Sequence, residues 1–133
     1  MKPKAFDYLK VSSAEEAVVA LAQGGEDARI IAGGLSLMPM LNFRLAEPSI
    51  LIDISRADSL NYIRETGGHV EIGAATRQAD LMRWDGLVNK LPLLNAAFPF
   101  IGHYQTRAKG TVCGSLSHAD PSSELPLCLA VLE

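Results

Sequence analysis

Apolar residues recur at helical spacing near the start of the chain. Positions 14, 17, 18, 21 and 22 are apolar and lie three or four residues apart or next to one another, which predicts one buried helix face. Ser13 and Glu16 form a Ser-x-x-Glu capping box, so the helix should begin there. Gly24-Gly25 predicts its end.

Two short apolar runs follow, and a glycine pair lies between them. The runs 28–32 and 50–54 each predict a buried strand. Gly33-Gly34 predicts a sharp turn, and Ser36 is expected to cap a helix that continues to about Leu45. Because a strand, a helix and a strand in this order place the strands parallel, we expect a small parallel βαβ lobe over residues 1–56.

The pattern changes after this unit. The runs 61–65 and 70–74 flank Thr66-Gly67-Gly68, which predicts an antiparallel hairpin. Thr76 is expected to cap a helix that ends near Trp84. These elements indicate that a lobe of mixed, antiparallel character begins at residue 57.

Helices dominate the rest of this second lobe, which we assign to residues 57–133. The pattern predicts a helix over 91–100 with Pro92 in its first turn, a polar loop over 103–109, a short strand or bend over 111–115, and a last helix from Ser122 or Ser123. The fold class is therefore α+β.

Composition agrees with an ordinary globular protein. The chain has 133 residues, of which 48% are hydrophobic and 20% charged, and this is enough to bury a core. The net charge of −3 gives no electrostatic reason to bind a nucleic-acid backbone, so we expect no nucleic-acid partner.

Cysteine usage and hydropathy bear on location. Cys113 and Cys128 fit no CxxC pattern, and two thiols cannot hold an iron–sulfur cluster alone. This usage predicts a reducing compartment, the cytoplasm. We expect no signal peptide, because no apolar stretch follows Lys2 and Lys4, and no transmembrane segment, because the longest apolar run (91–101) is too short.

The first candidate binding segment is Ala32-Gly33-Gly34-Leu35-Ser36. It follows a predicted strand and precedes a helix, where the first amides have no internal partner and the helix dipole favours an anion. A pyrophosphate could be held there by main-chain amides without any lysine. The segment is neither GxGxxG nor a P-loop, and taken alone a plain turn with Ser36 as a cap explains it slightly better.

The second candidate segment runs from Gly110 to Ser115 and is followed by His118 and Asp120. It is again rich in small and hydroxylated residues. An extended dinucleotide lying between two lobes would need one loop from each, so two such segments in one acidic chain favour a shared binding cleft.

Other polar residues have simpler interpretations. His118 and Asp120 are half a metal site at most, so we expect no metal. Cys113 has no evident base, which excludes it as a nucleophile, and we assign no catalytic residue. Arg107 and Lys109 are expected to be a solvated pair, and Asp53 ends a strand with no obvious partner.

These segments resemble a known family. The stretches 32–39, 44–48 and 51–54, followed by 101–103 and 110–126, are similar in order and content to the FAD-binding medium subunit of the molybdenum hydroxylases, the xanthine dehydrogenase and carbon monoxide dehydrogenase family. The likeness runs through nearly the whole chain.

The resemblance implies an FAD site in the two-lobed fold of vanillyl-alcohol-oxidase-like flavoproteins. It assigns the pyrophosphate and flavin to a first segment comprising Ile30, Ile31, Ala32, Gly33, Gly34, Leu35, Ser36 and Leu37. It assigns further contacts to Gly110, Thr111, Gly114, Ser115 and His118, to Ser123 and Glu124 near the ADP or ribityl region, and to Ile101 and Gly102 lining the pocket.

Three residues depart from the family pattern. Leu35 stands where many relatives have a polar residue, Cys113 replaces the first of two usual glycines, and Ser115 replaces a common asparagine. The helical pattern also still runs at Glu133 without a stop signal. We therefore expect a truncated piece that lacks the rest of the second lobe and the family's C-terminal domain.

The implied function is electron transfer. In the family, a large molybdopterin subunit hydroxylates the substrate, and [2Fe–2S] clusters on a small subunit pass electrons to FAD and then to NAD or another acceptor. The alternatives are a non-catalytic α/β fragment or interaction module, whose glycine segments are only turns, and a stand-alone FAD-dependent oxidase.

Overall fold

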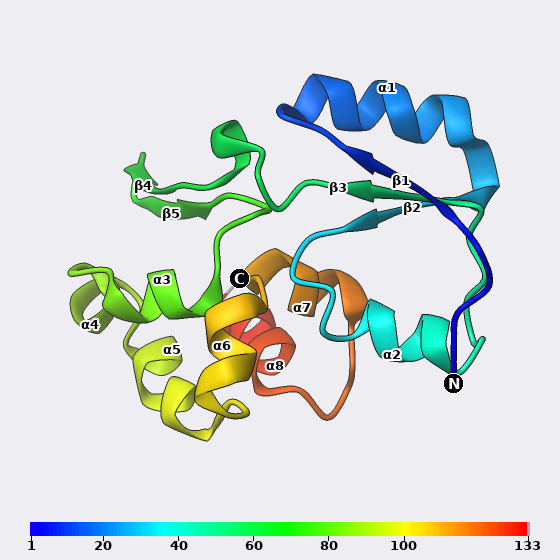
Figure 1. Cartoon of the computed structure of the whole chain (residues 1–133). Helices are drawn as coiled ribbons and strands as arrows, with labels where there is room; N and C mark the ends of the chain where they lie inside the picture. Colours follow the sequence, from blue (N-terminus) through cyan, green and yellow to red (C-terminus); the bar gives the residue numbers. More distant parts are fainter. Residues whose placement is uncertain (133) are drawn as a thin grey trace.

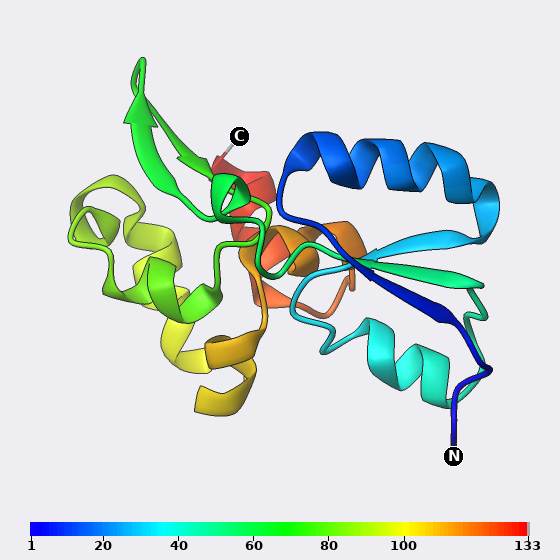
Figure 2. The ribbon, with the colours of Figure 1, turned by 45° about the horizontal axis from the view of Figure 1, so that its top comes forward.

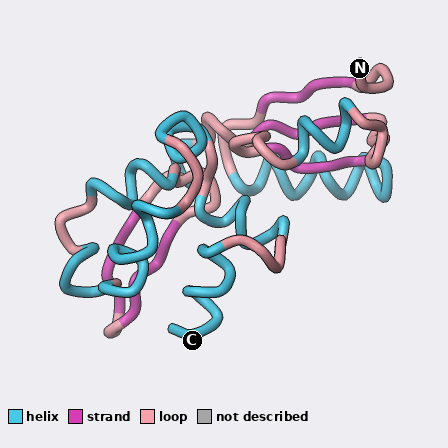
Figure 3. Tube along the Cα trace, turned by 90° about the horizontal axis from the view of Figure 1, so that it is seen from below, coloured by secondary structure: helices cyan, strands magenta, loops and turns pink. Residues whose placement is uncertain are grey.

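The computed structural model describes residues 1–132, which form two lobes lying side by side (Figures 1 and 3). The first lobe contains β1 (Asp7–Lys10), α1 (Ala14–Gly24), β2 (Ala28–Ile31), α2 (Leu37–Asn42) and β3 (Ile50–Asp53). The second contains β4 (Ile63–Thr66), β5 (His69–Ile72), α3 (Gln78–Arg83), α4 (Leu87–Lys90), α5 (Pro92–Ala97), α6 (Tyr104–Lys109), α7 (Val112–His118) and α8 (Glu124–Leu132). The fold is mixed α+β, as predicted.

The first lobe is built on a three-stranded sheet of order β1-β3-β2. Both outer strands run parallel to β3, which confirms the parallel arrangement, with Leu51 opposite both Tyr8 and Arg29. Helices α1 and α2 lie on opposite sides of this sheet (Figures 1 and 2). The carboxyl ends of β2 and β3 point toward the second lobe (Figure 1).

The outer strands differ from the prediction. Segment 50–54 is buried as expected, but β2 buries only Ala28 and exposes Arg29 and Ile30, because it forms one edge of the sheet. Strand β1 was not predicted at all. Its four residues are all exposed, and their sequence does not alternate between apolar and polar residues as a half-buried strand does. The segment is a strand because it pairs with β3.

Helix α1 begins and ends where the sequence predicts, but its buried face differs: Ala17 and Ala20 are buried, whereas Val18 and Leu21 are exposed. The Ser13 hydroxyl accepts a hydrogen bond from the Glu16 amide at 3.2 Å, as the capping box predicts. Ala17 and Ala20 pack with Ala28 and Ile52 in the core of the first lobe. The small side chains on α1 let this helix lie close to the sheet.

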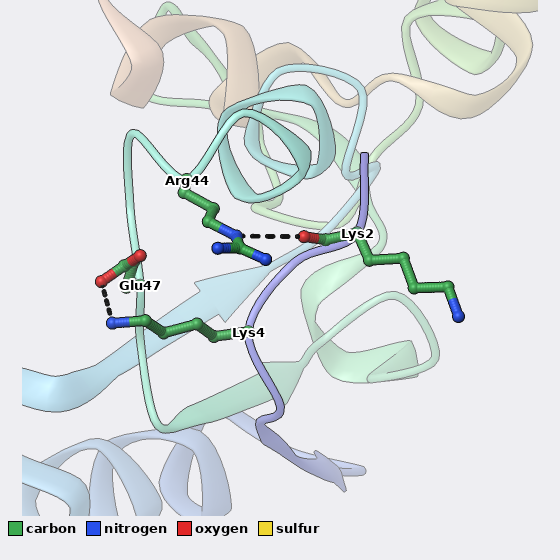
Figure 4. A network of polar contacts seen from close by, with 4 residues as sticks. All are labelled: Lys2, Lys4, Arg44 and Glu47. Atoms are coloured by element: carbon green, nitrogen blue, oxygen red, sulfur yellow. Dashed lines mark hydrogen bonds and ion pairs between the residues drawn. The ribbon is translucent and has the colours of Figure 1, made fainter.

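Helix α2 is shorter than predicted. It ends at Asn42 instead of Leu45, and Arg44 then adopts a left-handed conformation with φ of 55°. Ser36 does not cap it, because its backbone is already helical and its side chain bonds to no cap amide. The turn is fastened to the N-terminal segment, where Lys4 pairs with Glu47 and the Arg44 Nε donates to the Lys2 carbonyl at 3.4 Å (Figure 4).

The hairpin of the second lobe is confirmed, with shifted bounds. Strands β4 and β5 are antiparallel, and Thr66 pairs with His69 across the two-residue turn Gly67-Gly68. Thr76 does not cap α3, which begins at Gln78. The Thr76 side chain is buried and instead bonds the Tyr62 main chain, donating to its carbonyl at 2.9 Å and accepting from its amide at 3.1 Å.

Two helices replace segments predicted to be irregular. The polar segment 103–109 forms α6, which packs against α3, and 111–115 begins α7 instead of forming a strand or bend. In both cases the predictions were wrong because short helices with polar outer faces carry little apolar periodicity. Helix α4 was missed for the same reason.

The second lobe has its own core, centred on Phe98. This ring belongs to one buried cluster with Leu81, Leu94, Leu125 and Cys128. Cys128 is therefore a core residue. Helix α5 begins at Pro92, as predicted, and a short 3-10 turn continues it through Phe98–Phe100. The first lobe has a separate core, so each lobe has a core of its own.

We predict that Phe98→Ala lowers the free energy of unfolding by about 3–5 kcal/mol, because it removes a large side chain from a filled core. Phe98 is 1% exposed, whereas Phe100 in the same turn is 77% exposed. Phe100→Ala should change stability by less than about 0.5 kcal/mol. Urea unfolding measures both, and equal losses in the two variants would contradict this core assignment.

Candidate functional site

A cleft of about 380 Å³ lies between the two lobes. The first lobe lines it with residues at or near the carboxyl ends of its strands and at the turn after β2, and the second lobe lines it from the junction before α3 and from the α6–α7 turn. The residues are Tyr8, Ile31, Ala32, Gly33, Gly34, Met38, Asp53 and Ser55 on one side, and Ala75, Arg77, Lys109 and Thr111 on the other. Parallel sheets bind ligands at this end of their strands.

The two predicted glycine segments meet at this cleft. A Cβ atom added to Gly33 would lie 2.5 Å from the Lys109 carbonyl oxygen and 2.8 Å from the Gly110 Cα. Only glycine allows the main chains to approach so closely. The expectation that segments 32–36 and 110–115 share one cleft is therefore confirmed.

Main-chain donors are concentrated in the first of these segments. Gly34 has a φ of +72°, which turns the chain sharply after β2. No amide of residues 33–36 donates to another group in the described chain, whereas the Gly34 and Ser36 carbonyls accept from Met38 and Met40. The segment thus presents consecutive N–H groups without protein partners. The sequence predicts that the dipole of α2 attracts an anion. Because α2 has only six residues, the unpartnered amides are the stronger contribution to anion binding.

The second segment is held in place by its main chain. Gln78 N donates to the Gly110 carbonyl at 2.9 Å, and Val112 N donates to the Thr76 carbonyl at 3.1 Å. The Thr111 hydroxyl accepts from Gly114 N at 3.1 Å and so caps α7. Thr111 both lines the cleft and starts this helix.

The opposite wall contains a buried carboxylate. Asp53 accepts hydrogen bonds from the Tyr8 hydroxyl and, at 2.8 Å, from Ser55 N. Burial alone would raise the pKa of Asp53, but these hydrogen bonds outweigh it and hold the pKa below its usual value. The same hydrogen bond raises the pKa of Tyr8. The expectation that Asp53 has no partner was wrong, because the partner lies on the unpredicted β1.

The cleft collects part of the predicted binding set. Ile31, Ala32, Gly33, Gly34 and Thr111 line it directly. Leu35 and Gly110 meet beside it, since the Leu35 Cδ1 lies 3.4 Å from the position of a Cβ on Gly110. Ile30 is exposed, because side chains alternate along a strand and Ile30 therefore lies on the opposite face from Ile31. Leu37 is the first residue of α2.

The remaining predicted residues lie away from this cleft. The Ser115 and Ser123 hydroxyls are 3.4 Å apart and join α7 to the start of α8, where Glu124 is the first residue. His118 is exposed in the last turn of α7. Ile101 is buried in the second core, and Gly102 follows it.

Two cations in the cleft were missed or interpreted differently. Lys109 is exposed, as a solvated residue would be, but it also lines the cleft, and so does Arg77, which the sequence did not single out. Arg107 is not a free loop residue, because its Nη1 donates to the carbonyls of Ile101 at 2.7 Å and Gly102 at 2.9 Å. The only indication in the sequence that Arg77 could be a site residue is that a cation stands between the predicted hairpin and the predicted helix.

The described residues give no sign of acid–base, nucleophilic or metal chemistry. Residues 1–132 contain no group of three or more metal-ligating side chains. Burial raises the pKa of the Cys113 thiol, which disfavours the reactive thiolate. Within that same part of the chain, no helix is both long and apolar enough to cross a bilayer. The arrangement suits the binding of an extended ligand that carries an anionic group.

Comparison with known proteins gives a consistent match. A family model described as "FAD binding domain in molybdopterin dehydrogenase" matches residues 4–133. The chain is 48% identical to the 6-hydroxypseudooxynicotine dehydrogenase complex subunit alpha of Paenarthrobacter nicotinovorans, covering 100% of this chain and 45% of that protein. It is 43% identical to the carbon monoxide dehydrogenase medium chain of Hydrogenophaga pseudoflava, covering 98% and 46%.

Solved structures agree with this match. Quinoline 2-oxidoreductase from Pseudomonas putida 86 superposes with a TM-score of 0.93 at 37% identity, covering 99% of this chain and 46% of that one. Carbon monoxide dehydrogenase from Hydrogenophaga pseudoflava, in a form lacking the Mo-pyranopterin moiety, gives 0.89 at 44% identity, covering 95% and 44%. The chain spans slightly less than half the length of these relatives.

The carboxylate of Asp53 generates a pH prediction. Because its pKa is lowered in the folded state, Asp53 stabilises the fold above its unfolded pKa, about 3.9, and this stabilisation is lost as the pH falls through the folded pKa. We expect unfolding free energy to fall in acid less steeply for Asp53→Asn than for the wild type. Tyr8→Phe, which removes one donor, should lie between them.

Urea unfolding at a series of pH values measures these slopes. An acid dependence identical in all three proteins would contradict the hydrogen-bonded state of Asp53.

Proposed function

The chain belongs to the family of FAD-binding domains of molybdopterin dehydrogenases, and from this membership we propose that it holds FAD across the cleft between its lobes. One observation carries the placement: the segment 33–36 has amides without protein partners, and its first residue, Gly33, meets the Lys109–Gly110 main chain at the cleft. Amides of this kind bind phosphate oxygens. The residues present therefore fit a dinucleotide diphosphate.

Each segment has a proposed part in binding. The amides of 33–36 and the Ser36 hydroxyl, which caps no helix, hold the diphosphate. Gly110 and Thr111 close the cleft from the second lobe. The other predicted residues would contact an extended cofactor beyond the cleft, and they are Ile30, Ile31, Ala32, Leu35, Leu37, Ile101, Gly102, Gly114, Ser115, His118, Ser123 and Glu124.

We further propose that the protein serves as the FAD-binding medium subunit of a multi-subunit molybdenum hydroxylase. Relatives are named as a medium chain and as a subunit of a dehydrogenase complex, which supports a subunit over a stand-alone oxidase or an interaction module. When bound, FAD supplies a centre that takes electrons from [2Fe–2S] clusters on a small subunit and passes them to NAD or another acceptor. A large molybdopterin subunit would carry the substrate site.

The two lobes are proposed as FAD-binding subdomains, 1–56 and 57–133, of the vanillyl-alcohol-oxidase-like type. Two separate hydrophobic cores support this division. The rest of the second subdomain and a C-terminal domain would lie beyond this sequence. A cytoplasmic location remains a prediction from the two unpaired thiols.

We predict that Gly33→Ala weakens FAD binding by roughly 10- to 100-fold, about 1.4–2.8 kcal/mol, because the added Cβ must push the two main chains apart. Gly67→Ala is the control for backbone strain alone: Gly67 has a φ of +59°, so alanine strains the hairpin turn, but a Cβ there meets nothing within 4 Å and the turn does not line the cleft. Flavin absorbance per protein and an FAD titration measure the effect, and circular dichroism should show unchanged helix content.

Equal FAD affinity in the Gly33→Ala, Gly67→Ala and wild-type proteins would refute the placement of the diphosphate at this contact.

A further inference from the structure

We propose that Arg77 is a cofactor-binding residue that supplies positive charge to the diphosphate of FAD, with Lys109 as a weaker second cation. This role rests on the proposed FAD site. It extends that site from a cradle of neutral amides to one with a charged wall.

The position of Arg77 is fixed by the residues around it. Its main chain pairs with Thr111 in an isolated antiparallel bridge between the start of α3 and the α6–α7 turn. Thr76 and Gln78 on either side are buried, at 1% and 5% exposure, whereas Arg77 is exposed and lines the cleft. The main chain of Arg77 is thus anchored, and Arg77 lines the same cleft as Gly33 and Gly34.

The charge of Arg77 has no partner inside the protein. Other arginines of the second lobe are engaged: Arg64 pairs with Glu71, Arg83 pairs with Asp80, and Arg107 bonds to main-chain carbonyls. Within residues 1–132, the side chains of Arg77 and Lys109 make no hydrogen bond and no ion pair with another group. Both cations therefore remain available to a ligand in the cleft.

The one acid in the cleft does not compete for these cations. Asp53 already accepts hydrogen bonds from Tyr8 and Ser55 on the first lobe. The cleft consequently has a hydrogen-bonded, charged carboxylate on one wall and two unpaired cations on the other, with the glycine amides at the turn. A diphosphate is the part of a dinucleotide that fits the second wall, because guanidinium groups bind phosphate oxygens through two parallel hydrogen bonds.

This assignment changes the expected character of binding. Neutral amides alone would give an affinity for FAD that depends little on ionic strength. An arginine contributing charge makes the affinity fall as salt rises, because mobile ions screen the attraction. The salt dependence therefore separates a charged contact from a purely structural role of Arg77.

The test is a flavin titration of the apoprotein, prepared with whatever subunits co-purify. FAD and riboflavin, which lacks phosphate, are each titrated at several NaCl concentrations, and bound flavin is followed by fluorescence. Arg77→Ala should raise the Kd for FAD by about 10- to 100-fold and reduce its salt dependence, with riboflavin binding unchanged. Arg77→Lys should recover part of the loss, and Lys109→Gln should give a smaller one.

Arg83→Ala is the matched control. Arg83 is the last residue of α3, the helix that Arg77 precedes. It is exposed and pairs with Asp80 at 2.6 Å outside the cleft, so its loss should leave FAD binding and its salt dependence unchanged. Thermal unfolding of each variant verifies that the fold is retained.

The outcomes separate the two proposals. A wild type that binds no FAD overturns the FAD site and the role of Arg77 with it. A wild type that binds FAD, beside an Arg77→Ala variant with the same Kd and salt dependence, overturns only the assignment of Arg77. Equal losses of FAD and riboflavin binding also overturn it, because the effect would then not depend on phosphate.

Discussion

The approach of the Gly33 main chain to the Lys109 carbonyl determines how the two lobes meet. A Cβ at this point would lie 2.5 Å from that oxygen, so the contact exists only because residue 33 has no side chain. The contact places the amides of 33–36 beside Gly110 and Thr111, although the segments are more than 70 residues apart in the sequence. This main-chain contact is what brings the two glycine segments to one cleft.

The parallel sheet supplies the other half of the arrangement. Because both outer strands run in the same direction as β3, the turn after β2 and the residues that follow β3 emerge at the same edge. Asp53 lies at this edge, where the Tyr8 hydroxyl and the Ser55 amide donate hydrogen bonds to its carboxylate and hold its pKa low. Its negative charge therefore belongs to the wall of the first lobe, and the cations Arg77 and Lys109 belong to the second lobe.

The three departures from the family pattern have structural explanations. Leu35 extends toward Gly110, where it adds an apolar contact between the lobes in place of a polar group. Cys113 is accommodated beside the second strand of the hairpin, with its Sγ 3.5 Å from the Ile72 carbonyl oxygen. The shorter arm of Ser115 reaches the Ser123 hydroxyl at 3.4 Å and so connects α7 with the segment before α8. None of these residues obstructs the cleft.

The sequence by itself determined the features that depend on neighbouring residues: the Ser13 capping box, the buried run that becomes β3, the Gly67-Gly68 hairpin turn, the start of α5 at Pro92, and the two glycine segments of the site. Their signals are spacing, capping and turn chemistry, which act over a few residues. Only the tertiary structure decided that exposed 7–10 is a strand, that 104–109 is a helix, that Tyr8 bonds Asp53 and that Arg77 lines the same cleft as the glycine turn. These depend on partners distant in the chain, such as the 45 residues between Tyr8 and Asp53, and exposed polar segments carry no local pattern that reveals such partners.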